Sequence, residues 1–184
     1  KNYEVINPFV SATNDAFNRL KPGFEAPVCI VTSIGTTPEV PSRNRTILAG
    51  LIRDVGNPMA TRFELRACNP YTNTYVALAA IYSAVLDGAK MAAEHTTEEL
   101  LKELSKKPGE EGFYLEKDRA YRSEEDVFED YTQEERDRMF GAPPATVWEN
   151  MENLTNFPEK RAIVTAGGAL DEAIVKSFVE GALL

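Results

Sequence analysis

The segment NRLKPGFEAP, residues 18–27, carries a single carboxylate, Glu25, between two prolines. Proline fixes φ and keeps its preceding neighbour out of the helical region, whereas Gly23 admits turns that other residues resist. The segment is therefore predicted to be a shaped loop. Loops on rigid scaffolds often carry catalytic groups, which makes Glu25 a candidate for chemistry; a plain turn is the simpler alternative.

A second concentration of charge lies on residues 61–68, TRFELRAC, which are predicted to form a strand. Alternation along a strand separates its apolar residues from its charged ones. The charged face carries Arg62, Glu64 and Arg66. Such a row is either a solvated face with cross-strand ion pairs or a binding surface. Because further arginines fall on neighbouring predicted strands and loops, we favour a binding surface.

Charge is unevenly distributed along the 184 residues, whose net charge is −9. Residues 1–66 hold six arginines and two lysines against six carboxylates, whereas residues 67–184 carry a net charge of −11. The arginines are Arg19, Arg43, Arg45, Arg53, Arg62 and Arg66. Their planar forks suit carboxylate or phosphate groups. The acidic total and the lack of a continuous basic stripe argue against nucleic acid, so a small anionic ligand is predicted.

Composition predicts a folded protein of one domain, or one domain with an appendage, because 43% of the residues are hydrophobic. The longest apolar run, residues 75–86, is too short to cross a bilayer, so no membrane span is predicted. The N-terminus lacks the apolar stretch of a signal peptide, and two cysteines are too few for a disulfide scaffold. A cytoplasmic location is therefore expected, with Cys29 and Cys68 as buried free thiols.

The first half of the chain is predicted to be rich in strands. Strands are expected over residues 26–34, 46–54 and 61–68, and residues 35–45 form a loop that delivers two arginines. A helix over about 75–94 follows, apolar nearly all round at its start and hence predicted to be buried.

The second half is predicted to be helical. Thr96 with Glu99 offers a capping box for a helix that runs to about residue 107. The charged segment 110–137 is predicted to be exposed loop and helix, with another helix start at Thr132 and Glu135. A short helix follows near residue 147, and residues 169–184 have the spacing of an amphipathic helix. Its apolar positions are Leu170, Ile174, Val175, Phe178 and Val179.

Several common chemistries have no motif in this sequence. The sole histidine, His95, stands at a predicted helix junction and is interpreted as a solvated surface residue. No His/Cys cluster has zinc spacing, and neither a Ser-His-Asp set nor a glycine-rich phosphate loop is present. Arginine-based anion chemistry is the pattern that stands out.

Three stretches together resemble the glutamine synthetase family, specifically the C-terminal part of its catalytic domain. They are residues 18–27, the RNR at 43–45 with the later Arg53, and RFELRACNPYTNTYVALAAIYSAVLDG at 62–88. Order, spacing and residue type agree in all three, and a weaker likeness returns at 165–179. The usual Asp and Pro of the family are replaced by Asn69 and Thr74, and the spacing from Arg45 to Arg53 is longer than usual.

The resemblance implies catalytic roles for three residues. Glu25 corresponds to a glutamate flap that closes the site and takes a proton from bound ammonium. Arg45 resembles the arginine that stabilises the transferring phosphoryl group. Glu64 matches a metal-ligating glutamate, which implies Mg²⁺ or Mn²⁺ as cofactor.

The resemblance also implies contacts with the substrates glutamate and ATP. Arg19 and Arg66 look like the arginines that hold glutamate and its activated carboxyl. Arg53 and Arg62 look like contacts to the phosphates of the nucleotide. Residues 110–137 lack the tyrosine-containing adenylylation motif of the family, so no such regulation is inferred.

The implied fold is α+β: antiparallel strands of a partial glutamine-synthetase-type catalytic barrel packed with helices, and a helical C-terminal half. Residues 1–184 are expected to be a fragment that lacks the small β-grasp domain, the first part of the catalytic domain and most of the metal ligands. The parent is expected to be a ring-shaped homo-oligomer in the cytoplasm, without nucleic-acid or membrane partners.

The implied activity of the parent is ATP-dependent ligation of ammonia to L-glutamate through γ-glutamyl phosphate, which makes glutamine in nitrogen metabolism. The chain by itself is expected to be inactive. Two alternatives stay open: a γ-glutamyl ligase that uses an organic amine, and a non-catalytic anion-binding or assembly module.

Overall fold

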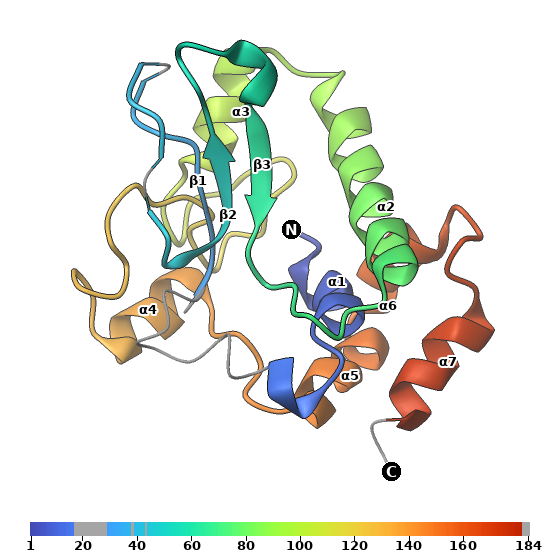
Figure 1. The fold of residues 1–184 in the computed structure, drawn as a ribbon. Coiled ribbons are helices and arrows are strands. Elements are labelled where there is room, and N and C mark those ends of the chain that lie inside the picture. Colours follow the sequence, from blue (N-terminus) through green and yellow to red (C-terminus); the bar gives the residue numbers. More distant parts are fainter. Residues whose placement is uncertain (17–28, 38, 43, 182–184) are drawn as a thin grey trace. The chain divides into compact units, whose positions relative to one another are not determined.

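The computed structural model describes residues 1–16, 29–37, 39–42 and 44–181 (Figure 1). The chain forms two compact units. Unit 1 comprises residues 1–18, 68–96 and 144–184, and unit 2 comprises residues 19–67 and 97–143. The predicted strands lie in unit 2, and most of the helices lie in unit 1.

Unit 2 contains a three-stranded sheet in the order β1-β2-β3, formed by Cys29–Ser33, Ile47–Ile52 and Arg62–Leu65. All three strands were predicted. The expectation of antiparallel strands is wrong for one pair, because β1 and β2 run parallel while β2 and β3 are antiparallel. A parallel pair needs a connection of about a dozen residues, which segment 34–46 supplies. The described residues form this small mixed sheet and show no closed barrel.

The core of unit 2 joins the sheet to the charged segment that follows α3, Thr97–Leu104. Its buried residues are Val31, Ile47, Ala120, Val127 and Phe140. The prediction that residues 110–137 are simply exposed is therefore wrong, because this segment also buries Arg119, Tyr121 and Arg136. Apolar residues at intervals among the charges anchor the segment, and a count of charges does not detect them.

Helix α4, Gln133–Phe140, begins at the predicted capping box. The Thr132 hydroxyl accepts from the Glu135 backbone N–H at 3.3 Å, and the Glu135 carboxylate accepts from the Thr132 N–H at 2.8 Å. Each side chain satisfies a backbone group that the helix start leaves without an intrahelical partner. This local signal was readable in the sequence.

Unit 1 packs five helices around one apolar core (Figure 1). They are α1 Tyr3–Val10, α2 Thr74–Ala92, α5 Val147–Asn156, α6 Pro158–Thr165 and α7 Glu172–Gly181. The core contains Val5, Phe9, Ala80, Met151, Leu154, Val164, Leu170 and Val175. The predicted apolar face of the last helix is confirmed, since Ile174, Phe178 and Val179 also pack against this core. Helix α1, which contains Pro8, was not predicted.

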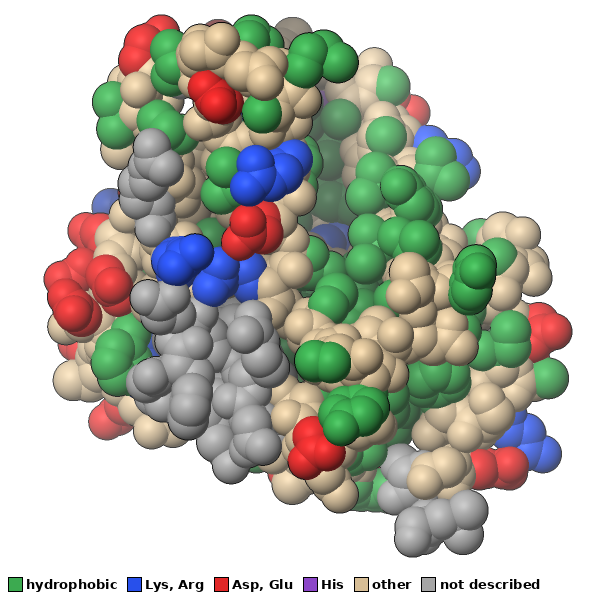
Figure 2. Space-filling model, viewed as in Figure 1, with side chains coloured by type: hydrophobic (Ala, Val, Ile, Leu, Met, Phe, Trp, Pro, Cys, Tyr) green, Lys and Arg blue, Asp and Glu red, His purple; other side chains and the backbone are tan. Residues whose placement is uncertain are grey.

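Helix α2 differs from its prediction, because most of its apolar surface is exposed. Among its described side chains only Ala77 and Ala80 are buried. Its exposed large apolar residues are Tyr75, Leu78, Tyr82, Val85 and Leu86. Green hydrophobic side chains accordingly cover the surface over α2 in Figure 2.

By length and composition alone, α2 could cross a membrane. One such helix is weak evidence, since core helices pass the same test. Just before α2, Cys68 is a free, half-buried thiol whose pKa is raised by burial. The side chain of Cys29 lies outside the described residues.

A buried carboxylate organises the turn that follows α3. Glu103 accepts backbone N–H groups from Phe113 and Tyr114, both at 3.0 Å, and from Leu115 at 2.6 Å. Burial raises the pKa of this carboxyl, but the three N–H donors and nearby Lys106 outweigh burial, so the pKa lies below its ordinary value of 4.5. The ionised form is therefore the one that the fold stabilises.

We predict that Glu103→Gln lowers the free energy of unfolding by about 1–3 kcal/mol near pH 7, because a neutral amide replaces a carboxylate that accepts three donors. The folded-state pKa is depressed, so the difference from wild type is full above about pH 4.5 and shrinks as pH falls through the folded-state pKa. Urea unfolding at several pH values measures it. The exposed Glu129→Gln control should stay within about 0.5 kcal/mol of wild type, and a pH-independent deficit of Glu103→Gln would contradict the assignment.

Candidate anion-binding site

A pocket of about 190 Å³ in unit 2 brings several predicted site residues together. Its lining residues are Ser42, Asn44, Arg45, Gly50, Ile52, Arg62, Glu64 and Arg66. Figure 2 shows cationic side chains gathered around an acidic one on the surface over β2 and β3. Three guanidinium groups and one carboxylate thus share one concave surface.

Strand pairing positions the charged row. In the antiparallel pair, Gly50 lies opposite Glu64 and Ile52 lies opposite Arg62, and the Arg66 N–H donates to the Leu48 carbonyl at 2.9 Å. Directly opposed residues point to the same face of a sheet. The predicted alternation is therefore confirmed, and glycine opposite Glu64 leaves space beside the carboxylate.

The two arginines of this row differ in how firmly Glu64 holds them. Arg66 Nη1 donates to Glu64 Oε1 at 2.8 Å and keeps 11% of its side chain exposed. Arg62 Nη2 lies 3.8 Å from Glu64 Oε2 and exposes 59% of its side chain. Arg66 is therefore oriented by a short charge-assisted hydrogen bond, whereas Arg62 can turn toward a ligand.

The third cation, Arg45, reaches the pocket from the loop between β1 and β2. Before it, the Asn44 side chain accepts from the Thr46 N–H at 2.9 Å and from the Thr46 hydroxyl at 2.7 Å. At the start of the loop, Gly35 has φ of +86°, and a Cβ there would overlap the Val40 carbonyl oxygen. The loop thus folds back tightly before it delivers Arg45.

The structure does not bring every predicted residue to the pocket. Arg53 follows β2 and is not among the described residues that line the pocket. Glu25 and Arg19 lie outside the described residues. Conversely, Ser42 and Asn44 line the pocket and were not singled out, because small polar residues in a loop give no pattern of their own.

The described residues do not by themselves fit a divalent metal ion. No group of three or more His, Cys, Asp or Glu side chains lies close enough within them to hold one. Glu64, the predicted ligand, directs its carboxylate toward Arg62 and Arg66. Mg²⁺ and Mn²⁺ need several oxygen ligands, and the described residues offer too few of them.

A larger pocket, of about 390 Å³, lies in unit 1. It is lined mainly by small and apolar residues of α2 and α6, with Asp87 and Lys90 as its charged groups. Since it holds none of the predicted site residues, the smaller pocket of unit 2 is the candidate site.

A family model described as "Glutamine synthetase, catalytic domain" matches residues 1–117, which include every arginine of the pocket and Glu64. The chain belongs to this family. The part of the chain beyond residue 117 lies outside the match.

Curated relatives support the same assignment. Glutamine synthetase of Vibrio alginolyticus is 27% identical over 98% of this chain, and that of Bradyrhizobium diazoefficiens is 28% identical over 98%. Glutamine synthetase of Streptomyces filamentosus is 40% identical over 47% of the chain and 17% of its own length. The chain spans about 30% of the length of the first two relatives.

We predict that Arg66→Lys weakens the binding of inorganic phosphate to this chain by about tenfold, whereas Arg62→Lys changes it less than about threefold. Lysine keeps the charge of Arg66 but loses the planar fork that Glu64 orients at 2.8 Å. A lost charge-assisted hydrogen bond is worth roughly 1.5–3 kcal/mol. Isothermal titration calorimetry at low salt measures both variants, and equal losses would show that Glu64 orients neither arginine.

Proposed function

We propose that this chain supplies the cationic part of a glutamine synthetase active site, and that the protein to which it belongs ligates ammonia to L-glutamate with ATP. The observation that carries the proposal is the convergence of Arg45, Arg62 and Arg66 around Glu64 in one pocket. Phosphoryl transfer concentrates negative charge on the transferring group, and guanidinium groups neutralise that charge. Family membership supplies the reaction class.

The proposed reaction has two steps. The γ-carboxylate of glutamate attacks the terminal phosphorus of ATP, so that ADP leaves and γ-glutamyl phosphate forms. Ammonia then attacks the activated carbonyl carbon, inorganic phosphate leaves, and a proton is lost to give glutamine. In the first step negative charge moves from the carboxylate to the leaving ADP, and in the second it builds up on the carbonyl oxygen and the leaving phosphate, which favours a pocket lined by cations.

The three arginines of the pocket differ in geometry, and each is proposed to contact a different group of the substrates. Arg66, fixed by Glu64 and largely covered, is suited to hold a carboxylate or phosphate in one orientation. Arg62, mostly exposed, is suited to phosphates of a nucleotide that arrives from solvent. Arg45, on its loop, faces the same pocket and is assigned the transferring phosphoryl group.

Other parts of the proposal concern two residues outside the described ones, a described residue that does not line the pocket, and the metal cofactor. Glu25 is proposed to take a proton from ammonium, and Arg19 to contact glutamate. Arg53 is proposed to contact nucleotide phosphate, and Mg²⁺ or Mn²⁺ is proposed as cofactor, with Glu64 as one of several ligands. A ring-shaped homo-oligomer in the cytoplasm is the proposed setting.

A non-catalytic reading of the isolated chain also has an observation in its favour. One carboxylate, Glu64, faces three arginines in the pocket, and a single carboxylate cannot fix the coordination of a metal. We therefore propose that this chain alone binds small anions without making glutamine.

We predict that the chain binds inorganic phosphate weakly, with an affinity that falls as salt rises, because screening weakens the attraction between partly exposed charges. Calorimetry at several NaCl concentrations measures this binding. No glutamine should form when the same chain is incubated with ATP, glutamate, ammonium and either Mg²⁺ or Mn²⁺. Turnover by the chain alone would overturn the second expectation, and absence of phosphate binding would overturn the first.

We further predict that Glu25→Ala in the full-length protein lowers glutamine formation at limiting ammonium by about 10²–10⁴-fold, the usual contribution of a general base. Nucleotide binding should stay near wild type. The full-length protein, assayed with ammonium and separately with alkylamines, also separates the two ligase activities. Faster turnover with an alkylamine would replace glutamine synthesis by γ-glutamyl ligation of an organic amine.

A further inference from the structure

The loop that carries Arg45 is attached to a segment that the family match does not include. Residues 121–125 lie beyond residue 117, where the match ends. The Thr32 N–H of β1 donates to the Tyr121 carbonyl at 2.9 Å, and the Ser123 N–H donates to the Thr32 carbonyl at 3.1 Å. This segment therefore runs alongside β1, next to the start of the arginine loop.

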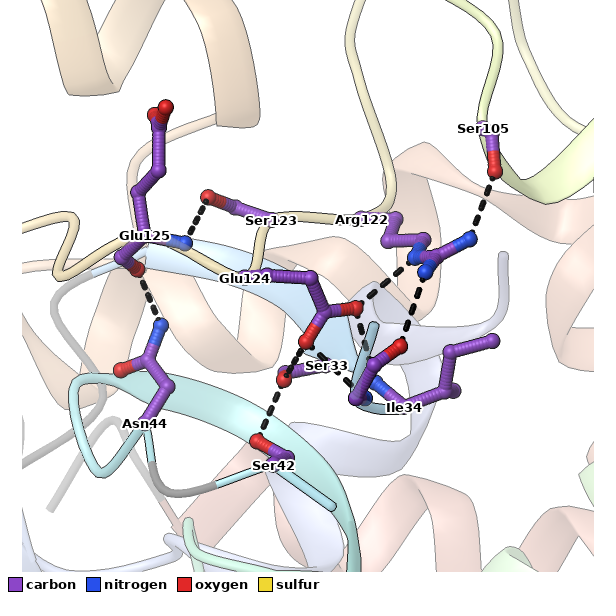
Figure 3. Close-up of polar contacts among 10 residues, drawn as sticks. Ser33, Ile34, Ser42, Asn44, Ser105, Arg122, Ser123, Glu124 and Glu125 are labelled. Atoms are coloured by element: carbon purple, nitrogen blue, oxygen red, sulfur yellow. Dashed lines mark hydrogen bonds and ion pairs between the residues drawn. The ribbon is translucent and has the colours of Figure 1, made fainter. Parts of the chain in front are cut away.

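Glu124 is the centre of a polar network at this junction (Figure 3). Its carboxylate accepts the backbone N–H of Ile34 at 3.1 Å and that of Gly35 at 2.9 Å. It also accepts Arg122 Nε at 2.8 Å and the Ser33 hydroxyl. Four donors thus converge on one carboxylate, and three of them belong to the chain that leaves β1.

The network continues from Glu124 to the lining of the pocket. The Ser33 hydroxyl is hydrogen-bonded both to Glu124 and to the Ser42 hydroxyl (Figure 3). Because a carboxylate only accepts, Ser33 donates to Glu124 and accepts from Ser42. Ser33 and Ser42 are buried, with 0% and 5% exposed, and Ser42 lines the pocket. Two hydrogen bonds therefore connect Glu124 to the pocket wall.

Two further contacts hold the loop at its ends. Arg122 Nη2 donates to the Gly35 carbonyl at 3.0 Å, and its Nη1 donates to the Ser105 hydroxyl at 2.9 Å. The Asn44 amide, next to Arg45, donates to the Glu125 carbonyl (Figure 3). The loop is thus fastened to residues 122–125 where it leaves β1 and again just before Arg45.

The charge state of Glu124 suits a side chain that accepts several hydrogen bonds. Burial raises the pKa of its carboxyl, but the hydrogen bonds from Ser33, Arg122, Ile34 and Gly35 outweigh burial, so the pKa lies below its ordinary value. The carboxylate is therefore ionised near neutral pH. An ionised acceptor makes stronger hydrogen bonds than a neutral one.

Arg45 needs such support more than the other cations of the pocket. Arg62 lies within β3, whose ladder to β2 fixes its backbone, and the Arg66 N–H bonds to Leu48 just beyond that strand. Arg45 stands on a loop, outside any strand. A side chain on irregular backbone loses more entropy when it binds a ligand, unless its loop is already ordered.

We propose that Arg122 and Glu124 are positioning residues that hold the loop 34–46 so that Arg45 faces the anion pocket. The inference rests on the proposed function, because it assigns Arg45 to anion binding. Both residues lie after residue 117, where the match to the family model ends.

The test compares Glu124→Gln with Glu125→Gln in this chain. Both variants remove one negative charge, but within the described part of the chain the Glu125 side chain bonds to the Tyr131 hydroxyl and to no residue of the loop. We expect Glu124→Gln to weaken phosphate binding by about tenfold in calorimetry, the scale of one charge-assisted hydrogen bond. Glu125→Gln should bind as wild type does. Equal affinities of the two variants would overturn the proposal.

A double-mutant cycle separates positioning from general damage. In the Arg45→Ala background, Arg62 and Arg66 still line the pocket, so phosphate binding stays measurable. If Glu124 acts through Arg45, Glu124→Gln should have little further effect in this background. An undiminished tenfold loss there would overturn the proposal, because the effect would not pass through Arg45.

Amide hydrogen exchange gives a readout that needs no ligand. Glu124→Gln should speed exchange at Thr36 and Val40, whose amides are bonded within the loop, while amides of β3 stay protected. Unchanged exchange at these loop amides would overturn the proposal. If the wild-type chain binds no phosphate, the proposed function is contradicted. Amide hydrogen exchange at Thr36 and Val40 then still tests whether Glu124 holds the loop.

A milder variant covers the case in which Glu124→Gln does not fold. Ser33→Ala keeps the pair of Arg122 and Glu124 and removes the hydroxyl that bridges Glu124 and Ser42. It should show the same loss of phosphate affinity and the same faster exchange, each to a smaller degree. Wild-type behaviour in both measurements would contradict the inference.

Discussion

Mutual repulsion of guanidinium groups is the constraint on which the site depends. Arg45, Arg62 and Arg66 line a pocket of about 190 Å³ in which Glu64 is the only acidic residue among the described lining residues. Bringing like charges into one pocket costs free energy, and the cost is larger where the side chains are partly covered from water. Glu64 relieves part of that cost by its 2.8 Å contact with Arg66. The remaining positive charge makes the pocket attractive to an anion, provided that the backbone keeps the cations from moving apart.

The fold opposes that separation in two different ways. On β3 the strand ladder is sufficient, because the backbone of Arg62 is paired with Ile52 and the charged residues alternate onto one face. The loop that carries Arg45 lies outside this ladder, and side-chain hydrogen bonds take its place: the Glu124 carboxylate accepts the Gly35 N–H, and the Asn44 amide donates to the Glu125 carbonyl. A strand and a loop thus need different support to hold their arginines in place. This difference explains why the pocket, which uses both, also depends on the segment around Glu124.

The sequence predicts features that depend on near neighbours. The alternation at Arg62, Glu64 and Arg66 and the capping box at Thr132 are local patterns, and the structure confirms both. The parallel pairing of β1 with β2 and the contact of Glu124 with Gly35 depend on residues far apart along the chain. A single sequence carries no signal for such pairings. The prediction that α2 is buried is wrong for the same reason, because the sequence of a helix shows that a face is apolar but not whether another element covers it.

The net charge of residues 67–184 does not show which of their carboxylates face solvent and which accept hydrogen bonds inside the fold. The acidic surplus of residues 67–184 indicates a solvated surface, yet Glu103 and Glu124 face inward and accept backbone N–H groups. A carboxylate is the side chain best able to accept several donors at once, and turns leave several N–H groups without partners. Part of the acidic surplus of the chain therefore serves to close its turns. In unit 2, Glu124 closes the turn at the start of the loop that carries Arg45, so a carboxylate from the acidic part of the chain supports a loop from the arginine-rich part.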